Sequence, residues 1–167
     1  MVRLQPVRVG EAARPLLLAV FPLQRGPGAV GLQLQDDGDL RRGGVYWLAQ
    51  DAPTFEARAP RFDELFADLA AKLGRAPALR PAVLDLLGRA HALAGRCLPP
   101  GPDELGELGA LAAEADALDP GDLPGAFPLE GVVLCLLLIF VSEEERYPRP
   151  RYKGARVLWE RLREVVG

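Results

Sequence analysis

The sequence predicts an α+β protein, in which an N-terminal antiparallel β-meander of three to four strands is followed by a C-terminal bundle of four to five helices. Two patterns lead to this prediction. Residues 1–50 alternate between apolar and polar side chains and are interrupted by turns rich in glycine and aspartate. After Pro60, apolar residues recur at helical spacing instead. The 167 residues fit a single domain, 1–167, with a possible subdivision into a β-meander at 1–50 and a helical part at 60–167.

Four segments have the composition of strands. Val2–Val9 alternates, but Pro6 offers no N–H to a neighbouring strand and would confine the segment to an edge of the sheet. Pro15–Leu23 is a continuous apolar run that suits a central strand. The remaining strands are expected at 29–35, where valine and leucine alternate with glycine and glutamine, and at 44–50.

Tyr46 and Trp47 stand next to each other in the last predicted strand. Because successive side chains of a strand point to opposite faces, one ring should enter the core and the other should face outward. An exposed aromatic ring is a common anchor for a partner, which makes Trp47 a candidate partner-binding residue. The alternative is that the C-terminal helix covers this ring.

Helical periodicity begins after Pro60. The first helix should end near Gly74, and the second should begin at Pro81, because proline favours the first turn of a helix. The apolar run Val132–Val141 fits a buried core helix, although a buried strand has the same signature. The predicted helices span residues 62–73, 81–98, 102–118, 127–145 and 155–166.

The amino-acid composition indicates the kind of organism and the cellular compartment to which the protein belongs. Nearly all basic residues are arginine, asparagine is absent, and serine, threonine and isoleucine occur once each, as in proteins from GC-rich bacterial genomes. Scarce asparagine, methionine and cysteine also fit a thermophile. The N-terminus lacks the apolar segment of a signal peptide, and the longest apolar run has ten residues, whereas a membrane span needs roughly 20. We therefore expect a cytoplasmic protein.

Charge is distributed unevenly along the chain, although the net charge is only −3. Residues 101–145 contain eleven acidic residues and no lysine or arginine, whereas residues 146–167 contain seven basic residues and two acidic ones. This asymmetry indicates partners of defined charge.

The basic strip, residues 146–156, holds five cations, two tyrosines and two prolines. The prolines favour an extended backbone, along which cations can follow the phosphates of a nucleic acid while tyrosine rings stack on its bases. Two other interpretations stay open: a connector whose arginines pair with Glu143–Glu145, and a docking strip for an acidic protein surface. The candidate nucleic-acid or partner-binding residues are Arg146, Tyr147, Arg149, Arg151, Tyr152, Lys153 and Arg156.

The acidic residues between 103 and 122 also allow two interpretations. They form the solvated face of an amphipathic helix, or they hold a basic partner. In the second case the candidate partner-binding residues are Asp103, Glu104 and Glu107.

Catalytic arrangements are weakly supported. His91 is the only histidine and has no serine or cysteine at helical spacing from it. A metal-dependent nuclease would need an acidic residue two positions before a lysine, but Arg151 holds that place before Lys153. Carboxylates at 36–39 or 143–145 would have to bind its metal. Cys97 and Cys135 form no CxxC pair, which argues against a disulfide framework or a zinc site. We expect neither a metal nor a cofactor.

These observations predict a non-catalytic accessory or adaptor subunit of a bacterial assembly, associated with nucleic acid through the basic strip. A purely protein–protein interaction module is the first alternative, and a metal-dependent hydrolase or nuclease is the second. We expect a protein partner and no membrane partner.

Overall fold

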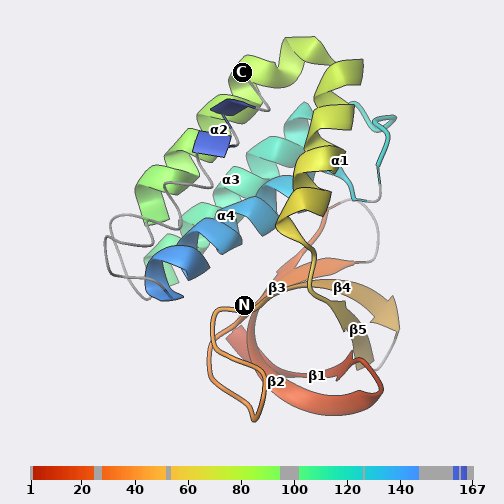
Figure 1. Cartoon of the computed structure of the whole chain (residues 1–167), viewed down its shortest axis with the longest axis vertical. Helices are drawn as coiled ribbons and strands as arrows, with labels where there is room; N and C mark the ends of the chain where they lie inside the picture. The colour runs from red at the N-terminus through yellow and green to blue at the C-terminus, as the bar shows by residue number, and fades with distance from the viewer. Residues whose placement is uncertain are drawn as a thin grey trace. The chain divides into compact units, whose positions relative to one another are not determined.

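The computed structural model describes residues 2–24, 28–51, 54–94, 102–125, 127–146, 160–161 and 163–164. The chain forms two compact units, Met1–Pro60 and Arg61–Gly167. The first unit is built from strands and the second from helices (Figure 1), so the α+β class predicted from the sequence is confirmed.

The first unit is a closed barrel of five strands that follow one another in sequence order (Figure 1). Consecutive strands pair antiparallel, and the barrel closes through a parallel pairing of Val7–Val9 with Phe55–Ala57. The strands are β1 (Val2–Val9), β2 (Ala12–Pro22), β3 (Ala29–Gln33), β4 (Val45–Asp51) and β5 (Thr54–Arg58).

The predicted meander of three to four strands is wrong, because a fifth strand closes the sheet into a barrel. When an odd number of strands run up and down in turn, the first and the last are parallel, and their pairing removes the sheet edges. Pro6 does not prevent this closure, because the pairing with β5 begins one residue later, at Val7. The missing strand, β5, lies in the stretch between residues 50 and 60 that the sequence analysis placed in neither part.

Alternate side chains of the strands fill the interior of the barrel. The ring of Tyr46 is buried there, and its hydroxyl donates a 2.9 Å hydrogen bond to Oε1 of Gln33. Nε2 of Gln33 donates to the carbonyl oxygens of Gln35 and Leu40, at 2.8 and 3.0 Å, so this buried amide has its partners. The apolar residues of the core are Val7, Leu16, Leu18, Val20, Ala29, Tyr46, Leu48 and Ala57.

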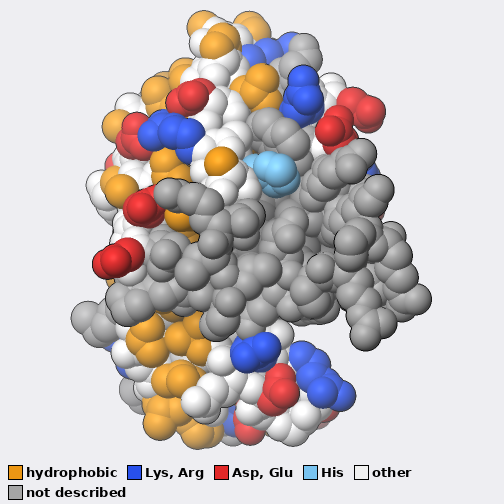
Figure 2. Space-filling view, turned by 90° about the vertical axis from the view of Figure 1, so that its left-hand side faces the viewer, with side chains coloured by type: hydrophobic (Ala, Val, Ile, Leu, Met, Phe, Trp, Pro, Cys, Tyr) orange, Lys and Arg blue, Asp and Glu red, His pale blue; other side chains and the backbone are white. Residues whose placement is uncertain are grey.

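The outer surface of the barrel is mixed in character. On the face drawn in Figure 2, hydrophobic side chains gather on one side of the barrel, and arginines with acidic side chains gather on the other. Among the described residues, Val2 and Leu4 of β1 are the large hydrophobic side chains that remain exposed, by 51% and 67%.

The described residues of the second unit form four α-helices and a short 3₁₀ turn at Pro77–Leu79. The last helix is central: it contacts each of the other three, and every side chain from Val132 to Leu138 is buried. A helix that is apolar all round belongs in a core. The helices are α1 (Phe62–Arg75), α2 (Arg80–Ala94), α3 (Pro102–Leu118) and α4 (Leu129–Arg146).

Most predicted helices agree with these bounds. The range predicted for α3 is confirmed, and residues 132–141 are helical, which rules out the alternative of a strand. Gly74 does not end α1, which continues to Arg75. The helix predicted at 155–166 lies mostly outside the described residues, of which 160–161 and 163–164 are helical. No helix within the described ranges is both long and apolar enough to cross a lipid bilayer.

Candidate functional site: a groove between α2 and α3

Helices α2 and α3 run antiparallel and leave a shallow groove between them. Ala82, near the start of α2, lines the same hollow as Leu118 at the end of α3, whereas Ala92, further along α2, lines a hollow with residues 107–111 of α3. Alanine recurs on both helices along this groove. Because alanine side chains are short, they leave room for another element to approach the two backbones.

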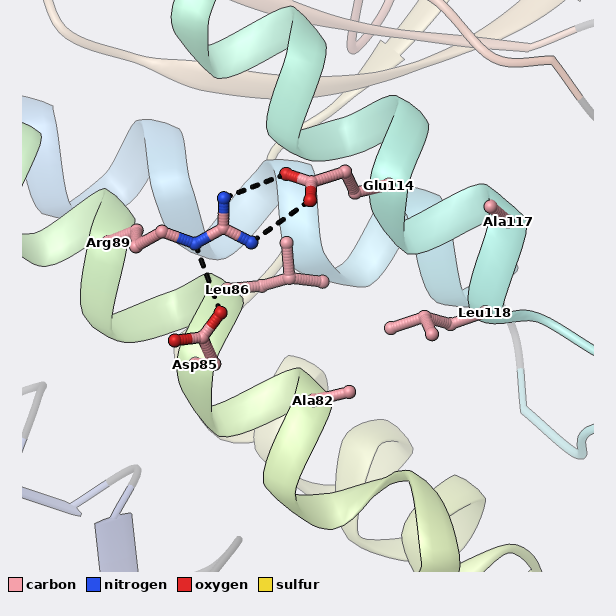
Figure 3. Close-up of a pocket in the computed structure, with 7 residues that line it drawn as sticks. All are labelled: Ala82, Asp85, Leu86, Arg89, Glu114, Ala117 and Leu118. Atoms are coloured by element: carbon pink, nitrogen blue, oxygen red, sulfur yellow. Dashed lines mark hydrogen bonds and ion pairs between the residues drawn. The ribbon is translucent and has the colours of Figure 1, made fainter.

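An ion pair bridges the groove at its middle (Figure 3). The guanidinium of Arg89, on α2, donates to both carboxylate oxygens of Glu114, on α3, at 3.0 and 3.1 Å. Its Nε donates to Oδ2 of Asp85, one turn earlier on α2, at 3.1 Å. Arg89 is therefore held by two carboxylates from two helices, in the bidentate geometry that guanidinium and carboxylate groups favour.

The ion pair divides the groove into two hollows of about 350 and 360 Å³. Leu86 lines the first and Leu111 the second, and both leucines are almost fully buried, which gives each hollow an apolar floor. The first hollow is lined by Ala82, Asp85, Leu86, Arg89, Glu114, Ala117 and Leu118. The second is lined by Arg89, Ala92, Glu107, Ala110, Leu111 and Glu114.

Negative charge predominates along the groove. The described residues that line it include three carboxylates, those of Asp85, Glu107 and Glu114, and one cation, Arg89. The hydrogen bonds with Glu114 raise the pKa of Arg89 above its ordinary value. The side chains of Arg89 and Glu114 are about half exposed, at 47% and 51%, and remain accessible to a ligand. The groove thus combines an apolar floor with an acidic rim.

The three acidic residues predicted to bind a partner lie at the beginning of α3. Glu107 lines the second hollow, and Asp103 is exposed one turn before it. Glu104 belongs to the same helix, but its side chain lies outside the described part. Asp85 and Arg89 were not predicted as site residues, because their only signal in the sequence is an acid–base pair at helical spacing of i, i+4.

The basic strip falls almost entirely outside the described residues. Arg146 is the last residue of α4. The remaining members lie in the part that the structure does not describe, and they are Tyr147, Arg149, Arg151, Tyr152, Lys153 and Arg156.

Trp47 lies on the outer face of β4, because its neighbours Tyr46 and Leu48 both belong to the barrel core. The alternation predicted for the two adjacent aromatic residues is therefore confirmed. Trp47 is half-buried, and atoms of its ring would be 3.6 and 3.9 Å from a Cβ placed on Gly28.

A second polar cluster, which the sequence analysis missed, lies in the interior of the helical unit. Lys72 Nζ donates to Oδ1 of Asp68 at 2.5 Å and to the carbonyl oxygen of Pro124 at 2.8 Å. Oδ2 of Asp68 accepts a 3.0 Å hydrogen bond from the backbone N–H of Phe127. The two side chains are 1% and 5% exposed, and every one of these contacts is internal. The pair therefore fixes the connection between α3 and α4, and it is too enclosed to meet a substrate.

The aspartates at 36–39, which would have to bind the metal of a hydrolase, have other partners. Arg14 Nη1 lies 3.1 Å from Oδ1 of Asp39 and 3.6 Å from Oδ2 of Asp37. Oδ1 of Asp36 accepts a 2.7 Å hydrogen bond from the backbone N–H of Arg42. These contacts bind the turn between β3 and β4 together. Across the described ranges, no group of three histidine, cysteine or acidic side chains is arranged to hold a metal ion.

Comparison with known proteins assigns no relationship to the chain: no family model matches it, and no curated protein or solved structure is significantly similar to it.

Proposed function

We propose that the protein is a non-catalytic adaptor that binds a partner protein through the groove between α2 and α3. The observation that carries this proposal is the Arg89–Glu114 bridge, with an apolar hollow on each side of it. A hollow with an apolar floor and a few placed charged groups suits the recognition of a partner's side chains. The described residues of the shallow groove offer exposed acids but no nucleophile paired with a base, which favours binding over catalysis.

The test is to fill the groove with large side chains. Ala110 and Ala117 are exposed and line different hollows, so Ala110→Trp with Ala117→Trp should obstruct both without disturbing the core. The matched control is Ala67→Trp with Ala71→Trp, at exposed positions of α1. Each double variant replaces two helical alanines by tryptophan, so both should lose a similar amount of stability through the lower helix propensity of tryptophan.

We expect the wild-type chain, purified from its host, to carry a partner protein in stoichiometric amount. The control variant should retain this partner, and the groove variant, with Ala110→Trp and Ala117→Trp, should lose it. The purified partner should then bind the wild-type chain and the control variant equally in calorimetry, and the groove variant at least tenfold more weakly. Equal binding of all three chains would overturn the proposal.

A second candidate function, association with nucleic acid, is favoured by one specific observation: the basic strip places five cations and two tyrosines within eleven residues. Cations along an extended segment with interspersed aromatic rings are suited to single-stranded nucleic acid. Fluorescence anisotropy with labelled DNA and RNA across a salt series tests it, because phosphate contacts give an affinity that falls as salt rises. Replacing Arg149, Arg151 and Lys153 by glutamate should abolish that binding, and an unchanged affinity would exclude the strip.

A further inference from the structure

We infer that the partner segment received by the groove is a short amphipathic helix with a basic polar face. This inference rests on the proposed function and specifies its ligand. Its basis is that the groove has the shape for a third helix and a charge that selects cations.

The shape of the groove fits one face of a helix. The lining residues run from Ala82 to Ala92 along α2, which is about 15 Å of helix, or roughly three turns. On α3 the lining residues run from Glu107 to Leu118, a similar length of about 16 Å. A helix bound in such a groove is anchored by apolar side chains at i, i+3 or i+4, and i+7. Two hollows separated by a bridge match two such anchors about two turns apart.

The charge of the groove selects a cationic ligand. The described residues that line it carry three carboxylates and one guanidinium, a net charge of −2. Both oxygens of Glu114 bind Arg89, but a carboxylate offers about four lone-pair sites, so each oxygen can accept a further hydrogen bond. The side chain of Asp85 is 67% exposed and can accept from a second cation. Arginine or lysine at the margins of the bound helix would therefore meet carboxylates.

The same charges disfavour acidic ligands. A glutamate that enters the groove would lie close to Glu107 or Glu114, and like charges brought together across an interface oppose binding. Arg89 offers little compensation, because its guanidinium already donates to Asp85 and Glu114. The groove should therefore distinguish a basic helix from an acidic one even when both carry the same apolar anchors.

The experiment uses the full chain, labelled with ¹⁵N, and two synthetic helical peptides of fourteen residues. Both peptides carry leucine at the same i, i+3 and i+7 positions, and their polar positions are arginine and lysine in one and glutamate in the other. We expect the basic peptide to shift the amide resonances of Ala82, Ala110 and Ala117, with an affinity at least tenfold above that of the acidic peptide. Glu114→Gln with Asp85→Asn should reduce this preference, whereas Asp122→Asn, in an exposed loop, should not.

The outcomes separate this inference from the proposed function. If both peptides shift the same groove resonances with equal affinity, the groove binds protein segments but the basic class is wrong. This inference is wrong if the basic peptide shifts only resonances outside the groove. It is also wrong if that peptide binds the variant with Ala110→Trp and Ala117→Trp as tightly as the wild-type chain. In either case the proposed function is decided by the partner recovered from the host alone.

Discussion

Lys72 and Asp68 form an ion pair in the interior of the helical unit, where their side chains are 1% and 5% exposed. They are one helical turn apart on α1, yet both reach the segment between α3 and α4, through Pro124 and Phe127. Asp119 acts on the same segment, because its carboxylate accepts from the backbone N–H groups of Gly121 and Leu129. Buried charges thus fix the chain that leads from the groove helix α3 into the central helix α4.

Lys72→Met tests the importance of this ion pair. The substitution leaves the carboxylate of Asp68 buried without its cation, and breaking a buried pair in this way costs about 3–5 kcal/mol. Urea unfolding of the full chain should show that loss. Adding Asp68→Asn should restore part of it, because the amide is neutral and its oxygen can still accept from Phe127. A loss below about 1 kcal/mol for Lys72→Met would mean that the pair is not a main support of the fold.

Gly125→Ala should be strongly destabilising for a steric reason. Gly125 has a φ of +130°, a conformation that other residues rarely adopt, and a Cβ at this position would overlap the carboxylate of Asp68 and Nζ of Lys72. Gly106 is the matched control: it lies within α3, and a Cβ there meets nothing within 4 Å. Gly106→Ala should therefore stabilise the chain by about 1 kcal/mol and raise its melting temperature. Gly125→Ala should lower the melting temperature. Equal melting temperatures for the two variants would contradict this account.

The helices could be predicted from the sequence because their apolar spacing is regular over many residues. The same spacing also held a signal for the buried lysine, since Lys72 stands three positions after Leu69 and seven after Leu65, on the apolar stripe of α1. Ala70 also stands at helical spacing from Phe66, yet it is exposed. A charged residue on an apolar stripe is therefore better taken as a buried ion pair than as an interruption of the pattern.

The barrel closure and the groove could not be predicted in the same way, because each depends on contacts between distant segments. Closure requires Val7–Val9 to find Phe55–Ala57, and the short strand β5 carries two charged residues among five. The bridge joins Arg89 to Glu114, 25 positions apart, and depends on how α2 and α3 pack. Local periodicity gives the elements, whereas pairing and packing decide which side chains meet.

The hydrogen-bonded pair of Tyr46 and Gln33 inside the barrel predicts which of two substitutions destabilises the chain more. Tyr46→Phe removes one hydrogen bond to Gln33, whereas Gln33→Leu removes that bond and two more, to the carbonyl oxygens of Gln35 and Leu40. Because an unsatisfied buried group costs about 1–3 kcal/mol, Gln33→Leu should destabilise the chain more than Tyr46→Phe. Denaturant unfolding of both variants checks the order. The reverse order would show that the tyrosine hydroxyl has a larger role than its bond to Gln33.

Arg14 gives a prediction about titration. Its hydrogen bond holds the pKa of Asp39 below the ordinary value. Because this pKa is lowered on folding, the interaction stabilises the folded chain at pH values above the pKa of Asp39 in the unfolded chain. That stabilisation is lost as the pH falls through the pKa of Asp39 in the folded chain. Arg14→Gln should raise the pKa of Asp39, which a ¹³C titration of its carboxyl carbon measures. Arg8→Gln, at an exposed position of β1, is the control and should leave that pKa where it is.

The bridge across the groove should contribute far less to stability than the buried pair. Arg89 and Glu114 are about half exposed, so water and salt screen their attraction. A double-mutant cycle with Arg89→Gln and Glu114→Gln should give a coupling energy below about 1 kcal/mol, measured by urea unfolding at physiological salt. The coupling should also weaken as salt is added. A coupling of several kcal/mol would mean that the bridge supports the packing of α2 on α3. With the small coupling expected, chains altered at the bridge stay folded, and any loss of binding that they show is then a property of the groove itself.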